Sequence, residues 1–446
     1  MDRFEAPVSY GQYLKQLTPS VLTMVFLSFY TTIDGFFVSR YAGSDALAAI
    51  NIVIPITCII FGVAVMIASG AGAIIGERRG EQKDYEANQI FSTMCCVLAV
   101  LAILFTVFGL LFLRPFVTLL GSTERLMPHV LPYAAVTLCG TAAMTFKLFF
   151  EYMVRTDGNS RIGLVMSMTG LLLNLLLDYV LVGVFSLGTF GAALGTVLSI
   201  SVSALIGLIY FLRHSHLRFC RPHFQWSILL RSCLNGIGDM LTEFSTGIIT
   251  FLFNILALHY FGEDGVAAVT IIMYIYYFFI AFYMGITVGA APVISYSLGA
   301  DNSAKINETL RYSFITIAIS SVIILAISLL GGPTMIGLFT NSETVAAITW
   351  EGLRLFSLLF LFIGANVFLS GYFTALGNGL AAAVISTLRS LVLACAFLLI
   401  LPHFLDVAGL WLAIPCSELV TLLISSVLYY RYGRVACIRQ RCLKHI

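Results

Sequence analysis

Long apolar segments recur along the whole chain and are separated by short polar stretches that carry most of the charged residues. An α-helix needs about 20 residues to cross about 30 Å of hydrocarbon, so apolar segments of this length predict membrane-spanning helices. We therefore expect an all-α integral membrane protein. The pattern predicts twelve transmembrane helices, at residues 17–38, 47–75, 89–113, 129–153, 162–185, 189–212, 236–258, 265–294, 310–332, 350–374, 380–402 and 406–430.

Composition excludes a soluble protein of this length. Of the 446 residues, 59% are hydrophobic and 10% are charged, whereas a soluble domain has about 25% charged residues. The first apolar segment is long and follows the mixed-charge residues 1–15, so we expect it to be retained and not cleaved as a signal peptide. The ten cysteines are scattered without a CxxC pair, which favours neither a zinc site nor a disulfide framework.

The positions of the basic residues predict the orientation of the chain. With the N-terminus in the cytoplasm, the outer loops hold only Arg40, Arg114 and Arg125, with Arg354 near the outer end of its helix. Such an excess of inner Lys and Arg residues predicts that both termini are cytoplasmic. The inner segments collect Arg3, Lys15, Arg78, Arg79, Lys83, Arg155, Arg161, Arg213, Arg218, Arg221, Arg231, Lys305, Arg311, Arg431, Arg434, Arg439, Arg441 and Lys444.

The chain repeats itself at an offset of 219 positions. This offset aligns Tyr41–Ile52 with Tyr260–Ile271, and it continues without a gap to align Gly158 with Gly377. An even number of helices per repeat keeps both copies in the same orientation, which predicts two parallel six-helix bundles. The expected division is an N-terminal bundle at 1–212, a cytoplasmic basic linker at 213–235, a C-terminal bundle at 236–430 and a cytoplasmic basic tail at 431–446. We interpret the basic linker as a determinant of orientation and expect no nucleic-acid partner.

Five motifs, in their order and spacing, give the chain a resemblance to a known family. They are Ile33–Ser39 (IDGFFVS), Arg155–Asn159 (RTDGN), Leu173–Asp178 (LNLLLD), Gly191–Thr196 (GAALGT) and Pro292–Ala300 (PVISYSLGA). The chain resembles the multidrug and toxic compound extrusion (MATE) transporters, and more closely their DinF/MepA-like bacterial branch. The resemblance implies a bacterial plasma-membrane protein that exports organic cations and drugs by alternating access, driven by protons or sodium ions.

Acidic residues inside apolar helices are the main candidates for function. An Asp in the middle of a membrane helix costs about 2.5–3.5 kcal/mol, so Asp34 and Asp178 each suggest a functional role. Asn174 and Asp178 share one helix face, and Thr196 adds a hydroxyl from the next helix. These four residues offer oxygen ligands to a sodium ion, or carboxyl groups to a proton, and the residue types permit either ion. The resemblance to MATE transporters favours the same four positions.

The repeat supports a specific role for this polar set. The offset of 219 places Phe253 opposite Asp34, Leu393 opposite Asn174 and Phe397 opposite Asp178. Packing shared by both bundles would leave similar residues in both copies, so the polar set is expected to serve a site. The alternative is an ordinary hydrogen bond between helices, worth about 0.6 kcal/mol.

Other intramembrane charges have weaker functional signals. Glu151 lies four residues from both Lys147 and Arg155, which predicts an ion pair along one helix and leaves a role in the substrate cavity as the alternative. Glu243 is a candidate for a second cation site in the cavity. Arg389 and Glu418 carry opposite charges in neighbouring predicted helices, and we expect them to form a buried pair.

The resemblance to MATE transporters implies a secondary active multidrug exporter, which needs no cofactor beyond its coupling ion, H⁺ or Na⁺. Its expected partners are small organic cations or drugs and the surrounding membrane lipid, and we expect a monomer. The main alternative is a lipid-linked oligosaccharide flippase of related architecture. An enzyme is not expected, because neither HExxH nor GxSxG occurs, and the absence of GxxxxGK[ST] disfavours an ATP-driven pump.

Overall fold

The computed structural model describes residues 9–42, 44–120 and 122–433, and the side chains of 29–48 lie outside this description. The first part of the chain forms α1 (Tyr10–Ala42), α2 (Ser44–Gly80), α3 (Asp84–Leu111), α4 (Leu113–Leu119), α5 (Met127–Cys139), α6 (Thr141–Thr156), α7 (Ser160–Asp178), the π-helical η1 (Tyr179–Val184) and α8 (Gly188–Arg213). The second part forms α9 (Trp226–Phe261), α10 (Glu263–Gly299), α11 (Ser303–Gly337), α12 (Glu343–Phe356), η2 (Ser357–Leu359), α13 (Phe360–Ala375), α14 (Gly379–Thr387), η3 (Leu388–Val392), α15 (Leu393–Leu428) and η4 (Tyr429–Gly433).

The helices confirm an all-α membrane fold. Of the residues searched, nine helices are long and apolar enough to cross a membrane, or ten if α5 and α6, which meet at 50°, form one span. Helix α1 adds a further 33-residue helix. The apolar segment Gly379–Gly433 has 55 residues, far more than the roughly 20 that one crossing needs, and it breaks at Asp406, where φ is 47°. That segment is long enough for two crossings, and with α1 the described helices agree with the predicted multi-pass arrangement.

Two of the predicted helices are broken near their centres. The prediction at 129–153 becomes α5 and α6, which bend at Gly140, where a Cβ atom would overlap the Val197 side chain. The prediction at 350–374 becomes the end of α12, the short η2 and α13. Both breaks lie within apolar sequence, so the hydrophobic pattern gave no sign of them. Within the predicted linker, residues 214–225 form a loop, and α9 begins at Trp226.

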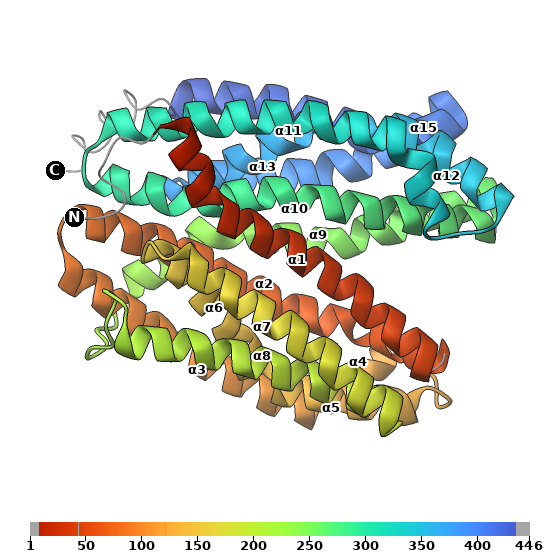
Figure 1. The fold of residues 1–446 in the computed structure, drawn as a ribbon, viewed down its shortest axis with the longest axis horizontal. Coiled ribbons are helices and arrows are strands. Elements are labelled where there is room, and N and C mark those ends of the chain that lie inside the picture. The colour runs from red at the N-terminus through yellow and green to blue at the C-terminus, as the bar shows by residue number, and fades with distance from the viewer. Residues whose placement is uncertain (1–8, 43, 121, 434–446) are drawn as a thin grey trace.

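The helices form two bundles that meet along α1, α2, α9 and α10 (Figure 1). Helices α2, α3 and α5–α8 pack together in the N-terminal bundle, and α9–α15 pack together in the C-terminal bundle. Helix α1 contacts α10 of the C-terminal bundle as well as α7 of its own bundle. At its start, the Tyr13 hydroxyl is hydrogen-bonded to Ser313 Oγ on α11, at 2.6 Å.

The backbone repeats between the two bundles as the sequence does. Gln82 and Asp301, which are 219 positions apart, both have positive φ, at 63° and 51°. Gly158 and Gly377, separated by the same offset, have φ of 85° and 71°, a conformation that glycine adopts without steric cost. The repeat therefore extends from the sequence to the turns that connect the helices.

One end of the molecule is rich in arginine. At this end α1 and α9 begin and α2, α6 and α8 finish (Figure 1). We call it the basic end, defined by Arg78, Arg79, Arg155, Arg213 and Arg231.

The two bundles make backbone contact toward the basic end. A Cβ atom at Gly70 would overlap the Ser232 carbonyl on α9, and a Cβ atom at Gly236 would overlap the Met66 carbonyl on α2. Closer to the basic end, Arg231 Nη2 lies 3.0 Å from Glu77 Oε2 across the interface. Toward the opposite end the ribbons of the two bundles diverge (Figure 1).

Substituting Gly236 by Val is expected to separate the bundles at the basic end, because the added side chain cannot fit against the Met66 carbonyl. Spin labels at Tyr85→Cys on α3 and Ala304→Cys on α11, in a variant without the native cysteines, report the distance between the bundles by double electron–electron resonance spectroscopy. The distance should increase in Gly236→Val. In the matched control Gly247→Val, where a Cβ atom meets nothing within 4 Å, it should not change. Equal distances in both variants would show that the glycine contact does not hold the bundles together.

Candidate functional site

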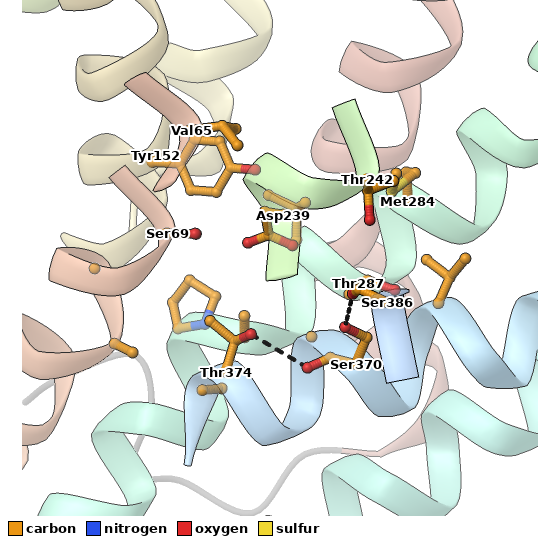
Figure 2. A pocket seen from close by; sticks show the side chains of 18 of the residues that line it. Val65, Ser69, Tyr152, Asp239, Thr242, Met284, Thr287, Ser370, Thr374 and Ser386 are labelled. Carbon is orange, nitrogen blue, oxygen red and sulfur yellow. Dashed lines mark hydrogen bonds between the residues drawn. The ribbon is translucent and has the colours of Figure 1, made fainter. Parts of the chain in front are cut away.

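A cavity of about 110 Å³ lies between the two bundles, and we call it the central cavity (Figure 2). Helices α2 and α6 supply one side, while α9, α10, α13, α14 and η3 supply the other. Asp239 lies 13 residues after the start of α9, which places it about 20 Å along the helix axis from the basic end. The cavity is thus within the membrane-spanning part of the molecule.

Glu151 is enclosed by positive charge beside the central cavity. Its Oε2 lies 2.6 Å from Lys147 Nζ, and its Oε1 lies 2.7 Å from Arg155 Nη2. Ser167 Oγ donates a further hydrogen bond to Oε1, at 3.1 Å. Glu151 is buried, while Arg155 lines the cavity. The predicted ion pair is confirmed, and the single negative charge of Glu151 is shared between Lys147 and Arg155 behind the cavity wall.

Arg389 is neutralised in a similar way on the opposite wall. Arg389 Nη1 lies 3.6 Å from Glu418 Oε1, and both side chains are buried. Asn366 Nδ2 donates to Glu418 Oε2 at 2.8 Å, which fixes the carboxylate. The predicted pairing of Arg389 with Glu418 is confirmed. Arg389 lines the cavity but shares its charge with a glutamate behind it.

Two carboxylates of α9 face the central cavity without such neutralisation. Asp239 and Glu243 are four residues apart on one helix face, and both line the cavity. Glu243 is exposed, and Figure 2 shows Asp239 directed toward the side that Ser69 and Tyr152 line. In the described part of the chain neither acid forms an ion pair within 4.0 Å, whereas both cavity arginines do. Counting the residues that pair with the two arginines, the cavity and its supporting ion pairs hold four acidic groups (Asp239, Glu243, Glu151 and Glu418) against three basic ones (Lys147, Arg155 and Arg389).

Small hydroxyl side chains complete the wall opposite Asp239. Ser370 Oγ and Ser386 Oγ are hydrogen-bonded at 2.7 Å, and Thr374 Oγ1 donates to the Ser370 carbonyl at 3.2 Å (Figure 2). Met284 and Val65 supply apolar surface to the same cavity. A ligand there would meet a mixed wall of apolar and hydroxyl groups in addition to the two acids.

The structure brings together three of the four residues predicted to bind the coupling ion. Asn174 and Asp178 are buried on α7, and Asn174 Nδ2 donates to Thr196 Oγ1 on α8 at 3.4 Å. The Asp178 carboxylate lies against the backbone of α8, because a Cβ atom at Gly195 on that helix would sit 2.7 Å from Asp178 Oδ1. Glycine at 195 thus gives the carboxylate its space. We call Asn174, Asp178 and Thr196 the α7 site.

The fourth residue, Asp34, lies in α1, but its side chain is outside the described residues. Helix α1 does pack against α7, so the backbone of α1 runs beside the α7 site. Among the described residues, no cluster of three or more His, Cys, Asp or Glu side chains could hold a metal ion. The α7 site offers mainly amide and hydroxyl oxygens beside one carboxylate, a donor set that suits a sodium ion or a proton.

The two groups of predicted residues occupy different places. Glu243 lines the central cavity, and Glu151 lies behind its wall. The residues of the α7 site do not line the central cavity, because none of its described lining residues belongs to α7 or α8. The sequence prediction missed Asp239, although its spacing of four residues from Glu243 in an apolar helix was a usable signal.

A model of the MatE family matches residues 19–180 and 240–400, one segment in each bundle. The chain belongs to the MATE family of transporters. Its relatives include the Multidrug export protein MepA of Staphylococcus saprophyticus, 24% identical over 421 residues, which cover 92% of this chain and 91% of that protein. MepA of Staphylococcus aureus strain MRSA252 is 22% identical over 423 residues, with 94% and 93% covered.

Solved structures share the fold of this MATE transporter. A structure described as the outward-facing conformation of a multidrug resistance MATE family transporter has a TM-score of 0.90 and 22% identity, with 96% of both chains covered. A transporter of the MOP superfamily from Pyrococcus furiosus has a TM-score of 0.88 and 22% identity over the same shares, and its description reports reverse polarity of the binding pocket. At such identity the likeness concerns the fold alone.

The RTDGN segment of this MATE transporter forms a structural junction. Asp157 accepts hydrogen bonds from the Tyr210 hydroxyl and Ser215 Oγ, both at 2.7 Å, and its Oδ1 lies 3.1 Å from Arg79 Nη1. Asp157 therefore joins α2, α8 and the following loop at the basic end. This motif therefore contains a structural residue, Asp157, and a residue that lines the central cavity, Arg155.

Replacing Glu151 by Gln is expected to lower stability by about 3–5 kcal/mol, because the buried Arg155 and the half-buried Lys147 would lose their partner. Thermal unfolding in detergent measures the effect. The exposed substitution Glu263→Gln is the matched control and should leave the unfolding temperature unchanged. A Glu151→Gln protein as stable as the control would show that the buried ion pairs contribute nothing.

Proposed function

We propose that this MATE transporter exports organic cations by antiport with protons or sodium ions. The observation that carries the proposal is the pair Asp239 and Glu243 in the central cavity, whose charges are not balanced by ion pairs as those of Arg155 and Arg389 are. Two carboxylates in a low-dielectric cavity attract a cationic ligand and disfavour an anionic one. The names of the MepA relatives, as multidrug export proteins, agree with this assignment.

The lining of the cavity suits ligands of varied shape. Met284 is flexible and polarizable, and the Tyr152 ring offers an aromatic face to an organic cation. The serine and threonine hydroxyls of α13 and α14 add hydrogen-bonding groups without fixing one geometry. Charge would select cations, while the adaptable wall would accept many of them.

The α7 site is the proposed place of the coupling ion, together with Asp34. Asn174, Asp178 and Thr196 supply oxygens for a sodium ion, and the carboxyl of Asp178 suits a proton. Helix α1 contacts α7 and also α10, which lines the central cavity. Ion binding beside α7 can therefore change how the bundles pack around the substrate, which is the coupling that antiport requires.

Alternating access would follow from rocking of the two bundles. In the described structure the bundles touch through glycine contacts toward the basic end and diverge at the other. Breaking the Arg231–Glu77 contact and the glycine contacts would open the basic end in turn. Each positive charge that moves inward contributes about 2.3 kcal/mol per 100 mV, enough to drive a substantial concentration ratio.

The proposed setting is a bacterial plasma membrane with the basic end and both termini in the cytoplasm. The clustering of Arg78, Arg79, Arg155, Arg213 and Arg231 at one end supports this orientation. The flippase alternative is disfavoured, because a pyrophosphate would need free arginines and both cavity arginines are paired with glutamates.

The double substitution Asp239→Asn with Glu243→Gln is expected to weaken binding of ethidium by about tenfold or more, equivalent to about 1.4 kcal/mol. Removing two negative charges lowers the attraction for a cation while keeping the shape of the cavity. Fluorescence titration of the purified protein measures the affinity.

The substitution Glu351→Gln, at an exposed position of α12, controls for the loss of an acid elsewhere. Its ethidium affinity should equal that of the unmodified chain. Unchanged affinity in the cavity variant would place the cation outside the central cavity.

A further inference from the structure

A second cavity lies on the N-terminal bundle, away from the central cavity. It has a volume of about 620 Å³ and is walled by α3, α6, α8 and the loop between α8 and α9, residues 214–225. We call it the lateral groove. Its lining is almost entirely apolar and rich in small side chains, and includes Ala99, Ala142, Phe146, Ala204, Leu208 and Phe219.

The position of the groove along the helices places it in one leaflet. Its lining on α3 runs from Ser92 to Ala99, which is about 12–22 Å along the axis from the start of that helix at the basic end. On α8 the lining ends at Leu208, five residues before the helix finishes at Arg213. The groove therefore occupies the half of the membrane nearest the basic end.

The loop over the groove is held against α3. The backbone N–H of Arg218 donates to Asn88 Oδ1 at 2.8 Å, and that of Cys220 donates to Ser92 Oγ at 2.9 Å. The Phe219 ring packs on Phe91, with 5.1 Å between ring centroids. These contacts make the loop a fixed wall of the groove.

Basic side chains flank the mouth that this loop forms. Arg218 precedes the lining residues Phe219 and Cys220, and Arg221 follows them. Both arginines are exposed, and in the described ranges neither forms an ion pair within 4.0 Å. Arg213, also exposed, ends the helix that forms one wall. The apolar lateral groove is thus flanked at its mouth by positively charged side chains.

We propose that the lateral groove binds an anionic phospholipid, with an acyl chain among its alanines and the headgroup phosphate on Arg218 and Arg221. The groove has the amphipathic profile of a single lipid, since its apolar length lies within one leaflet and its charged rim lies at the surface. A helix from a second copy of the chain would instead cover the arginines, and desolvating unpaired charges is unfavourable. Under the proposed orientation this is a lipid of the cytoplasmic leaflet.

The test uses native mass spectrometry of the full chain in detergent, after incubation with phosphatidylglycerol or with phosphatidylcholine. The unmodified chain should retain phosphatidylglycerol at least about tenfold better. The double variant Arg218→Gln with Arg221→Gln should lose that preference, since both substitutions lie on an exposed loop and leave the fold intact. Arg311→Gln, an exposed arginine at the basic end of the other bundle, should retain it.

A second variant tests the apolar part of the groove. Ala142→Trp, at an exposed lining position, should fill the space and reduce retention of both lipids. Equal retention of the two lipids by the unmodified chain would overturn the proposal, as would retention of phosphatidylglycerol that neither variant changes. A dimer that disappears in Ala142→Trp would assign the groove to a second copy and would also overturn it.

Discussion

A charge in the hydrocarbon of a membrane must find a partner, and this requirement organises the interior of the transporter. Lys147, Glu151 and Arg155 satisfy one another along α6, and Arg389 is held by Glu418 across the C-terminal bundle. The two arginines reach the central cavity already paired with glutamates. Asp239 and Glu243 line the cavity without such partners. These two unpaired carboxylates therefore set the electrostatic character of the cavity.

The shape of the cavity depends on a different feature, the glycine contacts between the bundles. Without side chains at Gly70 and Gly236, α2 and α9 approach to backbone contact toward the basic end. These contacts involve backbone atoms, so the charge of the cavity is set by the side chains that line it.

The hydrophobic pattern was sufficient to predict the membrane-spanning helices, because a span of about 20 apolar residues has one stable arrangement in a bilayer. Spacing along a helix also predicted the Glu151 ion pairs, and the neighbouring spans of Arg389 and Glu418 predicted their pairing. The breaks near Gly140 and at η2 could not be predicted, since they arise from packing between helices and not from local composition. The spacing of Asp239 from Glu243 could have placed both acids on one helix face, but which face meets the cavity depends on how α9 is rotated against α2. The contact of Asn174 with Thr196 agrees with the predicted grouping on α7 and α8, while its function as an ion site stays a prediction.

We propose that the substrate binds in the acidic central cavity, while the coupling ion binds at the α7 site. The most direct measurement follows ethidium in proteoliposomes under an imposed pH gradient and, separately, an imposed sodium gradient, for the unmodified chain and for Asp178→Asn. One gradient should drive uphill ethidium movement by the unmodified chain, and Asp178→Asn should lose that movement while still binding ethidium. Movement driven by neither gradient, or driven equally well in Asp178→Asn, would contradict the account.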